Sequence, residues 1–446
     1  MQKLILGLGS NFGNSKEKLR SAIRYLQSHT SKKIFHVIKV SALYQSEALL
    51  LPDSPPEWNL PYLNLALLCE TSLSPIETLQ WVKSIEKEMG RIPRGRWAPR
   101  EIDIDLLAWE ENEFTSDALT LPHPGLFSRS FAYLPLLDLL DPSLLNKPME
   151  KSNYWKELKM KLPVDDKLTS SISPFFPELV GILNITPDSF SDGGLFTTSF
   201  SALEQAEKLI ERGAKVLDIG AESTRPGATP LTWSEEWARL EKILPELIYT
   251  YKNKVTLSLD TRHPETAEKA VKLGVDWIND VSGGENPQFL SLLSSLQQHH
   301  TQFVFMHNLS VPADPKIILP KEEDPILHLK SWAKKKIHSF QEKGILPHQL
   351  IFDPGIGFGK SAEQSLEILK RIEELSDLGV KLLVGHSRKS YLSQLTKTPP
   401  DQRDLETVVV SLELAKKGVD YLRIHHPEIH QRAFQTLAPF QICIHY

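Results

Sequence analysis

Hydrophobic and polar positions after Glu178 repeat one pattern eight times: a short apolar run ends in polar residues, and a stretch with helical periodicity follows. The runs end at Asn184, Asp218–Gly220, Asp260, Asn279–Asp280, His307–Asn308, Asp353–Gly355, His386–Lys389 and His425–His426. Eight strand–helix units in about 250 residues are typical of an α/β fold, the (β/α)8 or TIM barrel. The C-terminal strand ends of that fold surround one pocket, so we predict functional residues there.

The N-terminal part of the chain has a different, α+β pattern. Strands are predicted at Lys3–Leu8, Ile34–Leu43, Tyr62–Thr71 and Glu101–Trp109, and helices at Ser15–Gln27 and Ser74–Met89. The resulting order β-α-β-β-α-β matches a ferredoxin-like sandwich. Prolines and charged, Ser-rich stretches follow, which indicates a connection between domains. We therefore predict a ferredoxin-like domain at 1–162, a linker at 163–177 and a TIM-barrel domain at 178–446.

Composition narrows the classes of function. The chain has 446 residues and a formal net charge of -5, which disfavours nucleic-acid binding because that usually needs a strongly basic surface. No apolar run has membrane-spanning length, and the N-terminal apolar stretch is too short for a secretory signal. Cys69 and Cys443 lack metal-binding spacing and argue against a disulfide framework. We expect a cytoplasmic protein with neither a nucleic-acid nor a membrane partner.

The strand EIDIDLL carries two carboxylates on one face, Asp103 and Asp105. Carboxylates about 7 Å apart repel each other, and one or two divalent cations would offset that repulsion and bind phosphate oxygens. Four arginines lie just upstream and suit a polyphosphate: Arg91, Arg94, Arg96 and Arg100. The alternative is an amphipathic strand with a solvated acidic face, and the residue types alone leave the two interpretations equal.

Short motifs in this half are similar to those of the 6-hydroxymethyl-7,8-dihydropterin pyrophosphokinases. They are GSN at 9–11, LY at 43–44, YLN at 62–64, RW-PR at 96–100, DID at 103–105 and LPHP at 121–124. The resemblance implies that Asp103 and Asp105 hold two Mg²⁺ ions with ATP, and that Arg91 and Arg100 bind the phosphates during catalysis. It further implies ATP contacts from His123 and Arg129, and pterin contacts from Tyr62, Asn64 and Phe131.

The predicted barrel mouth combines two kinds of side chain. The acceptors Asp260, Asn279 and Asp353 suit a flat heterocycle rich in N–H donors. Four other side chains suit an oligophosphate leaving group: Arg225, Lys389, Arg423 and His425. A single strand-end aspartate is more often a helix cap than a ligand, and we expect His307 to be a satisfied core histidine. The GIGFGK segment lacks full Walker spacing and is weak evidence for a phosphate loop.

The motifs NITPDSFSDGG, ESTRPGA, DPG-GFGK and SRK are similar to those of dihydropteroate synthases, and this resemblance covers residues 178–446. It implies a site for a pterin pyrophosphate made of these residues: Thr224, Arg225, Asp260, Asn279, Asp353, Lys389, Arg423 and His425. Arg225 and Lys389 would be catalytic, and Asn184 would contact Mg²⁺. The implied p-aminobenzoate site consists of Phe190, Pro226 and Ser387.

Together, the two resemblances imply two consecutive steps of folate synthesis, with ATP, hydroxymethyldihydropterin and p-aminobenzoate as substrates and Mg²⁺ as cofactor. The first step would transfer pyrophosphate to the pterin, and the second would form 7,8-dihydropteroate. We also expect a homodimer that forms through the barrel. Two alternatives stay open: the barrel is a pterin-binding methyltransferase, or it is a non-catalytic pterin-binding module.

Overall fold

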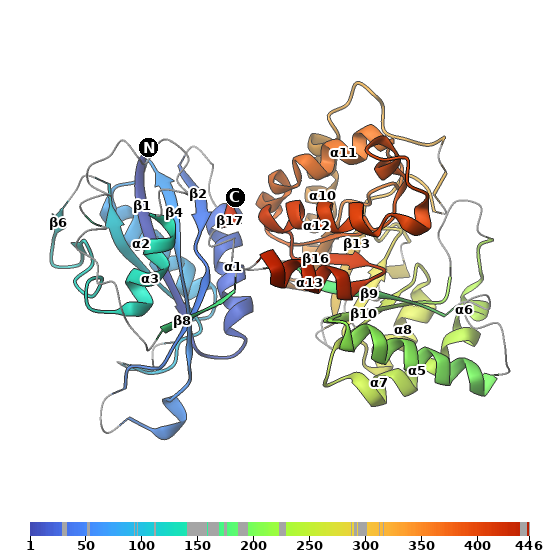
Figure 1. Ribbon diagram of the computed structural model, residues 1–446, viewed down its shortest axis with the longest axis horizontal. Helices are drawn as coiled ribbons and strands as arrows, with labels where there is room; N and C mark the ends of the chain where they lie inside the picture. Colours follow the sequence, from blue (N-terminus) through green and yellow to red (C-terminus); the bar gives the residue numbers. More distant parts are fainter. Residues whose placement is uncertain are drawn as a thin grey trace. The chain divides into compact units, whose positions relative to one another are not determined.

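The computed structural model describes residues 1–28, 34–50, 54–92, 94–95, 97–110, 113–140, 158, 169–173, 176–185, 195–222, 229–286, 288–289, 292, 301–311, 313–314, 316–437 and 444–445. The chain forms two compact units (Figure 1). The first comprises Met1–Phe176, Lys416–Gly418 and Thr436–Tyr446, and the second comprises Pro177–Ala415 and Val419–Gln435.

The first unit is built on a seven-stranded sheet. Its strands are β1 (Gln2–Ser10), β2 (Phe35–Val40), β3 (Leu43–Ser46), β4 (Tyr62–Thr71), β5 (Asp103–Trp109), β8 (Thr169–Ser173) and β17 (Ile444–His445). Its helices are α1 (Ser15–Ser28), α2 (Pro75–Glu88) and α3 (Ser130–Leu139), with a 3-10 turn at Pro56–Trp58 and a small hairpin of β6 (Phe114–Thr115) and β7 (Thr120–Leu121). The predicted strand at 34–43 is therefore divided between β2 and β3.

The ferredoxin-like prediction is confirmed. Strands β1, β2, β4 and β5 follow one another in the spatial order β2-β4-β1-β5, with α1 after β1 and α2 before β5. The alternation along β1 separates two cores: Leu4, Leu6 and Leu8 pack under α1 and α2, while Ile5 packs on the opposite face with α3. Helix α2 begins with a capping box, in which the Ser74 side chain accepts from the backbone N–H of Glu77.

Two sheet strands lie outside the limits expected for the first domain. Strand β8 pairs antiparallel with β3, so Thr169–Ser173 belongs to the sheet rather than to a free linker at 163–177. Strand β17 pairs with β2, which returns the end of the chain to the first unit and not to the barrel. The single strand predicted at 34–43, which forms β2 and β3, lies at an edge of the ferredoxin-like sheet. An edge offers unpaired backbone groups to such additional strands.

The second unit is a closed barrel of eight parallel strands. The strands are β9 (Glu178–Asn184), β10 (Val216–Gly220), β11 (Thr256–Asp260), β12 (Trp277–Asp280), β13 (Gln302–Met306), β14 (Leu350–Asp353), β15 (Lys381–Val384) and β16 (Tyr421–Ile424). The helices are α5 (Leu195–Glu211), α6 (Trp233–Leu240), α7 (Ile243–Tyr251), α8 (Pro264–Leu273), α10 (Pro325–Glu342), α11 (Ala362–Lys370), α12 (Asp404–Lys416) and α13 (Pro427–Leu437), and they surround the strands (Figure 1). Short 3-10 segments lie at Pro347–Gln349, Ile372–Leu378, Ser390–Gln394 and Pro400–Gln402.

The barrel prediction is confirmed, and each predicted polar group lies at or directly after a strand end. A cluster of buried side chains fills the interior before those ends: Val180, Val216, Trp277, Val304, Ile351, Leu383 and Tyr421. This core closes the barrel below the polar ends, so the ends form the floor of a mouth. Within the described residues, no helix is long and apolar enough to cross a membrane.

Candidate functional site

A cavity of about 230 Å³ lies in the first unit beside β1, β4 and β5. Eight of the residues predicted for nucleotide, metal or pterin binding line it: Tyr62, Asn64, Arg100, Asp103, Asp105, His123, Arg129 and Phe131. They come from three separate parts of the sequence: β4, the segment from Arg100 into β5, and the segment from His123 into α3. Convergent polar groups around a concave surface are what a small-molecule site requires.

The two aspartates of β5 face this cavity, while Ile104 between them is fully buried in the core. Asp103 and Asp105 lie opposite Gly9 and Gly7 of β1. A Cβ atom on Gly7 would lie 2.9 Å from the Leu107 side chain, so the absence of a side chain there is needed. Because both carboxylates line the cavity, the structure favours the binding interpretation of this strand over the solvated acidic face.

Three cations surround the acidic strand. Lys83 Nζ lies 3.5 Å from Asp105 Oδ1 and 3.9 Å from Asp103 Oδ1. Arg91 Nη1 lies 2.9 Å from Asp103 Oδ1, and Arg100 pairs with the other oxygen of Asp103. Two of these, Arg91 and Arg100, were predicted. Of the other predicted arginines, Arg94 pairs with Glu101 at 2.5 Å, and Arg96 lies outside the described residues.

Glu86 on α2 is a buried member of this group that the sequence analysis missed. Its carboxylate accepts from the Ile104 backbone N–H at 2.6 Å and from Lys83 at 2.7 Å, and it pairs with Arg91. Burial raises the pKa of Glu86, against the effect of Lys83 and Arg91. The helix thereby fixes both the backbone between the two aspartates and the arginine beside them.

The acidic strand fits a divalent cation that is shared with a substrate. Hard carboxylate oxygens from two residues at one pocket wall suit Mg²⁺, which keeps water and phosphate oxygens as its other ligands. Among the described residues, no group of three or more His, Cys, Asp or Glu side chains could hold a metal on its own. Phosphate oxygens and water would therefore have to complete the coordination.

Aromatic and amide groups occupy another part of the cavity wall. Asn64 Nδ2 donates to Ser46 Oγ at 3.0 Å, which fixes the orientation of the amide. The Arg129 guanidinium lies 6.0 Å from the Phe131 ring and 5.9 Å from the Trp97 ring. Burial lowers the pKa of His123 and raises that of Tyr62, so both favour their neutral forms. The Asn64 amide and the Phe131 ring suit the edge and the face of a flat, uncharged bicycle. Trp97, which was not predicted, has a φ of 69°.

At the barrel mouth, Asp218 is the centre of a hydrogen-bond network. Its Oδ2 accepts from Arg423 Nε at 2.6 Å and from Asn279 Nδ2 at 3.1 Å, while its Oδ1 accepts from Ser258 Oγ at 2.6 Å. Asp218 is only 1% exposed. The sequence analysis marked it as a strand end but did not assign it to the site, because its role depends on strands β11, β12 and β16.

Arg423 connects Asp218 to Asp260, whose Oδ2 accepts from Nη2 at 2.8 Å. Burial raises the pKa of Asp260 to about 8, against the effect of Arg423 and with a smaller contribution from Asp218. Gly220 of β10 pairs with Asp260 on one side and with Asn184 on the other. Three residues predicted for different parts of the substrate, Asn184, Asp260 and Arg423, are thus gathered at one side of the mouth.

Strand β14 and the loop after β15, which follow one another toward β16 in the barrel, bring Asp353 and Lys389 to the same mouth. Asp353 Oδ1 accepts from the Gly355 N–H at 2.8 Å, and Lys389 Nζ donates to the Ile356 carbonyl. Burial lowers the pKa of Lys389 to about 8, although Asp353 opposes this, and burial raises the pKa of Asp353. The Lys389 ammonium lies 4.8 Å from the centre of the Phe358 ring, an aromatic group not included in the predicted site.

The loop after β15 is held in a strained conformation. Arg388 has a φ of 59°, and its guanidinium donates to both oxygens of Asp404, at 2.7 and 2.8 Å. The neighbouring Ser387 Oγ lies 2.9 Å from His425 Nδ1. The bonds to Asp404 hold Arg388 in this conformation, with Ser387 and Lys389 on either side of it. The predicted amine site and the predicted phosphate site therefore share this loop.

His307 is a satisfied core histidine, as expected. It is fully buried, its Nδ1 lies 2.8 Å from Lys360 Nζ, and its Nε2 lies 3.2 Å from His328 Nε2. Burial lowers the pKa of His307 to about 2. Lys360 donates to the carbonyls of His307 and Phe358 and is buried, so it supports the segment around Phe358 rather than a phosphate.

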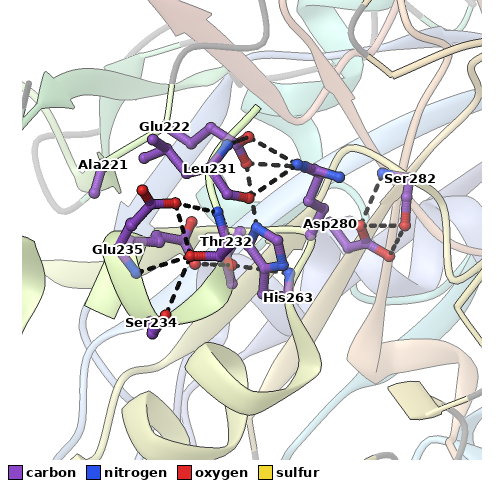
Figure 2. A network of polar contacts seen from close by, with 12 residues as sticks. Ala221, Glu222, Leu231, Thr232, Ser234, Glu235, His263, Asp280 and Ser282 are labelled. Atoms are coloured by element: carbon purple, nitrogen blue, oxygen red, sulfur yellow. Dashed lines mark hydrogen bonds and ion pairs between the residues drawn. The ribbon is translucent and has the colours of Figure 1, made fainter. Parts of the chain in front are cut away.

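A second network lies after β10 and includes Glu222 (Figure 2). The Glu222 carboxylate accepts from Arg262 at 2.8 and 2.9 Å and from the Leu231 N–H at 2.9 Å. Burial opposes its ionisation, but hydrogen bonds from His263, Arg262 and Leu231 outweigh burial and lower the pKa of Glu222 to about 2. Four predicted site residues, Phe190, Thr224, Arg225 and Pro226, lie outside the described residues.

Comparisons with known proteins match each of the two units to a family. Residues 5–141 match the family model of 7,8-dihydro-6-hydroxymethylpterin-pyrophosphokinase, and residues 180–425 match that of the pterin binding enzymes. The chain is 35% identical over 447 residues to the folate synthesis bifunctional protein of Chlamydia muridarum, covering 97% of both chains. It is 30% identical to that of Arabidopsis thaliana over 468 residues, covering 95% of this chain and 93% of the relative.

Solved structures resemble the barrel. Dihydropteroate synthase from Anaplasma phagocytophilum, with bound 6-hydroxymethylpterin-monophosphate, is 36% identical with a TM-score of 0.53, covering 58% of this chain and 97% of that one. The Xanthomonas albilineans dihydropteroate synthase with 4-aminobenzoic acid is 35% identical with a TM-score of 0.53, covering 58% of this chain and 92% of that one.

Proposed function

The chain belongs to the folate synthesis bifunctional proteins, and on that premise we propose how its own residues carry the two steps. The first unit transfers pyrophosphate from ATP to 6-hydroxymethyl-7,8-dihydropterin and releases AMP. The barrel then joins the product to p-aminobenzoate, giving 7,8-dihydropteroate and pyrophosphate. The observation that carries this assignment is that one chain holds both an acidic, cation-rich cavity and a barrel mouth with paired acceptors and cations.

In the first step, the pterin hydroxymethyl oxygen attacks the β-phosphorus of ATP, and the bond to the oxygen shared with the α-phosphate breaks. AMP leaves with that oxygen, and the hydroxyl proton passes to water. Tyr62, Asn64 and Phe131 would hold the pterin bicycle in the cavity, which places its hydroxymethyl group toward the acidic strand. Arg91 and Arg100 would stabilise negative charge on the transferred phosphates. His123 and Arg129 line the same cavity and would contact ATP.

Asp103 and Asp105 would hold Mg²⁺ in this unit. The cation would supply neutralisation of the polyphosphate charge and a template for its orientation. Arg91 and Arg100 contact Asp103, so they lie beside the carboxylates that would hold the cation and could bind phosphate oxygens of the same nucleotide. In the barrel, Asn184 lies at the end of β9 and would be the contact with Mg²⁺ there.

In the second step, the neutral aromatic amine attacks the pterin methylene carbon, and the C–O bond to pyrophosphate breaks. Asp260, Asn279, Asp353 and Lys389 would bind the polar edge of the pterin and favour electron donation from its ring to that carbon. The departing pyrophosphate would be bound by Arg423 and His425. Thr224 and Arg225, which are assigned from the sequence motif alone, would bind it as well. Ser387, with Phe190 and Pro226, would contact p-aminobenzoate.

The remaining expectations concern partners and organisation. A homodimer through the barrel is supported by Leu405 and Val409, which are 73% and 53% exposed one turn apart on α12. Charged substitutions at both positions should give a monomer in light scattering if this face is the interface.

A cytoplasmic location is tested by cell fractionation. Separate expression of 1–176 and 177–446 tests the domain limits, although the first fragment would lack β17.

Single substitutions in the full chain separate the two activities. Asp105→Asn should cut AMP formation by orders of magnitude, because it removes one charge from the metal-binding strand, while leaving condensation of supplied pterin pyrophosphate unchanged. Arg423→Ala should give the reverse pattern. Loss of both activities in either variant would point to a folding defect, and loss of neither would return the residue to a structural role.

A further inference from the structure

Lys83 is a cation of the acidic cavity that the two-step account does not use. It projects from α2, three residues before Glu86, toward β5. Its Nζ donates to the Ile104 carbonyl at 2.9 Å and to Glu86 at 2.7 Å, and it lies 3.5 Å from Asp105 and 3.9 Å from Asp103. One ammonium therefore binds the peptide between the aspartates and faces both carboxylates.

The charges around this strand already balance without a metal ion. The carboxylates are Glu86, Asp103 and Asp105, and the cations paired with them are Lys83, Arg91 and Arg100. Within the described part of the chain, Lys83 is the cation at ion-pair distance from Asp105. Any divalent ion that binds Asp105 therefore competes with the Lys83 ammonium for the same oxygen.

Lys83 differs from Glu86 in its freedom to move. The Lys83 side chain is 38% exposed, whereas Glu86 is only 3% exposed. The lysine stem is flexible and its ammonium can rotate between acceptors, so it can leave the carboxylates for a nearby phosphate oxygen. The hydrogen bond to buried Glu86 keeps the ammonium close to the strand during such a movement.

We propose that Lys83 is a built-in counter-ion of the acidic strand, which competes with the divalent cation for Asp105 and Asp103 and contacts the polyphosphate once that cation is bound. This inference rests on the proposed metal-binding role of the two aspartates. It assigns Lys83 two effects of opposite sign. Lys83 weakens metal binding in the absence of nucleotide and strengthens nucleotide binding in the presence of metal.

The test is direct binding by the full chain rather than turnover. Mn²⁺ binding is followed by electron paramagnetic resonance without nucleotide, and α,β-methylene-ATP binding is followed by calorimetry at saturating Mg²⁺. For Lys83→Met we expect roughly two- to tenfold tighter Mn²⁺ binding, because two partly exposed ion pairs are removed. We expect roughly three- to tenfold weaker binding of α,β-methylene-ATP.

Lys87→Met is the matched control, because Lys87 lies one turn further along α2 and is exposed. It should change neither affinity, and Lys83→Arg should restore most of the nucleotide affinity. Unchanged or weaker Mn²⁺ binding in Lys83→Met, with loss of binding in Asp105→Asn, would overturn the role of Lys83 alone. If Asp105→Asn binds Mn²⁺ as the wild type does, both the metal site and this inference fail.

Discussion

Asp218→Asn is the substitution that tests most sharply how the barrel mouth is organised. The change removes one negative charge and keeps the size of the side chain. The remaining Asn oxygen can still accept from Arg423 or Asn279, and the new NH₂ can face Ser258 Oγ, which is able to accept. The perturbation is therefore confined to the charge that aligns Arg423.

The expected magnitude follows from the bonds that lose their charge. Arg423 stays ionised in the variant, so its bond to position 218 changes from an ion pair to a hydrogen bond between a charged donor and a neutral oxygen. Losing the charge of the acceptor should cost about 1–2 kcal/mol of transition-state stabilisation, or roughly five- to thirtyfold in kcat/KM. Arg423 retains Asp260 as a partner, so the loss should not exceed this range.

The assay is condensation of supplied pterin pyrophosphate with p-aminobenzoate by the full chain, measured from pH 6 to pH 9. Asp218 also raises the pKa of Asp260, although burial is the larger cause. Removing its charge should therefore shift the Asp260-dependent limb of the profile to lower pH. AMP formation by the first unit provides an internal control for folding.

Asp280→Asn is the matched control. Asp280 is fully buried at the end of β12. It accepts from Ser282 (Figure 2) and from the Gly284 N–H rather than from a predicted site residue. The variant should lose stability, and it should shift the Asp260-dependent limb of the pH profile less than Asp218→Asn does, because Asp280 contributes less than Asp218 to raising the pKa of Asp260. Equal kinetics for Asp218→Asn and the wild type, or the same profile for both variants, would refute the view that Asp218 positions Arg423.

Three further predictions concern other parts of the chain. Because burial lowers the pKa of Lys389 to about 8, condensation should decline as pH rises through about 8, and Lys389→Arg should move that decline upward in a pH–rate profile. Folding lowers the pKa of Glu222 from 4.5 to about 2, which corresponds to about 3 kcal/mol of stability. This contribution is fully present above pH 4.5 and is lost toward pH 2. In urea titrations, Glu222→Gln should therefore destabilise the barrel at pH 7, and the difference from the wild type should shrink on acidification. Ser74→Ala should cost the first unit about 1 kcal/mol in the same titrations, without changing AMP formation.

The sequence predicted the barrel and its mouth because both follow from local patterns. Each apolar run is long enough for one strand, and the fold itself gathers the strand ends. The residues it missed act across the chain. Asp218 is assigned to the site only by its hydrogen bonds to side chains of β11, β12 and β16. Glu86 is distinguished from other helix carboxylates only by its contact with Ile104.

The limits of the first unit were harder to predict for a related reason. The segment around Thr169–Ser173 is Ser-rich and has no alternating apolar face, so nothing local distinguishes it from a linker. It forms a strand because β3 offers an edge, and β17 does the same at β2. Such added strands depend on partners that are more than a hundred residues away in sequence.

The central claim is that one chain performs both steps, and a coupled reaction tests it most directly. The wild-type chain is supplied with 6-hydroxymethyl-7,8-dihydropterin, ATP, Mg²⁺ and p-aminobenzoate, and AMP and dihydropteroate are measured together. The account predicts one dihydropteroate for each AMP, with Asp105→Asn inactive until pterin pyrophosphate is added. AMP without dihydropteroate, even when pterin pyrophosphate is supplied, would contradict the assignment of the barrel, and absence of AMP would contradict that of the first unit.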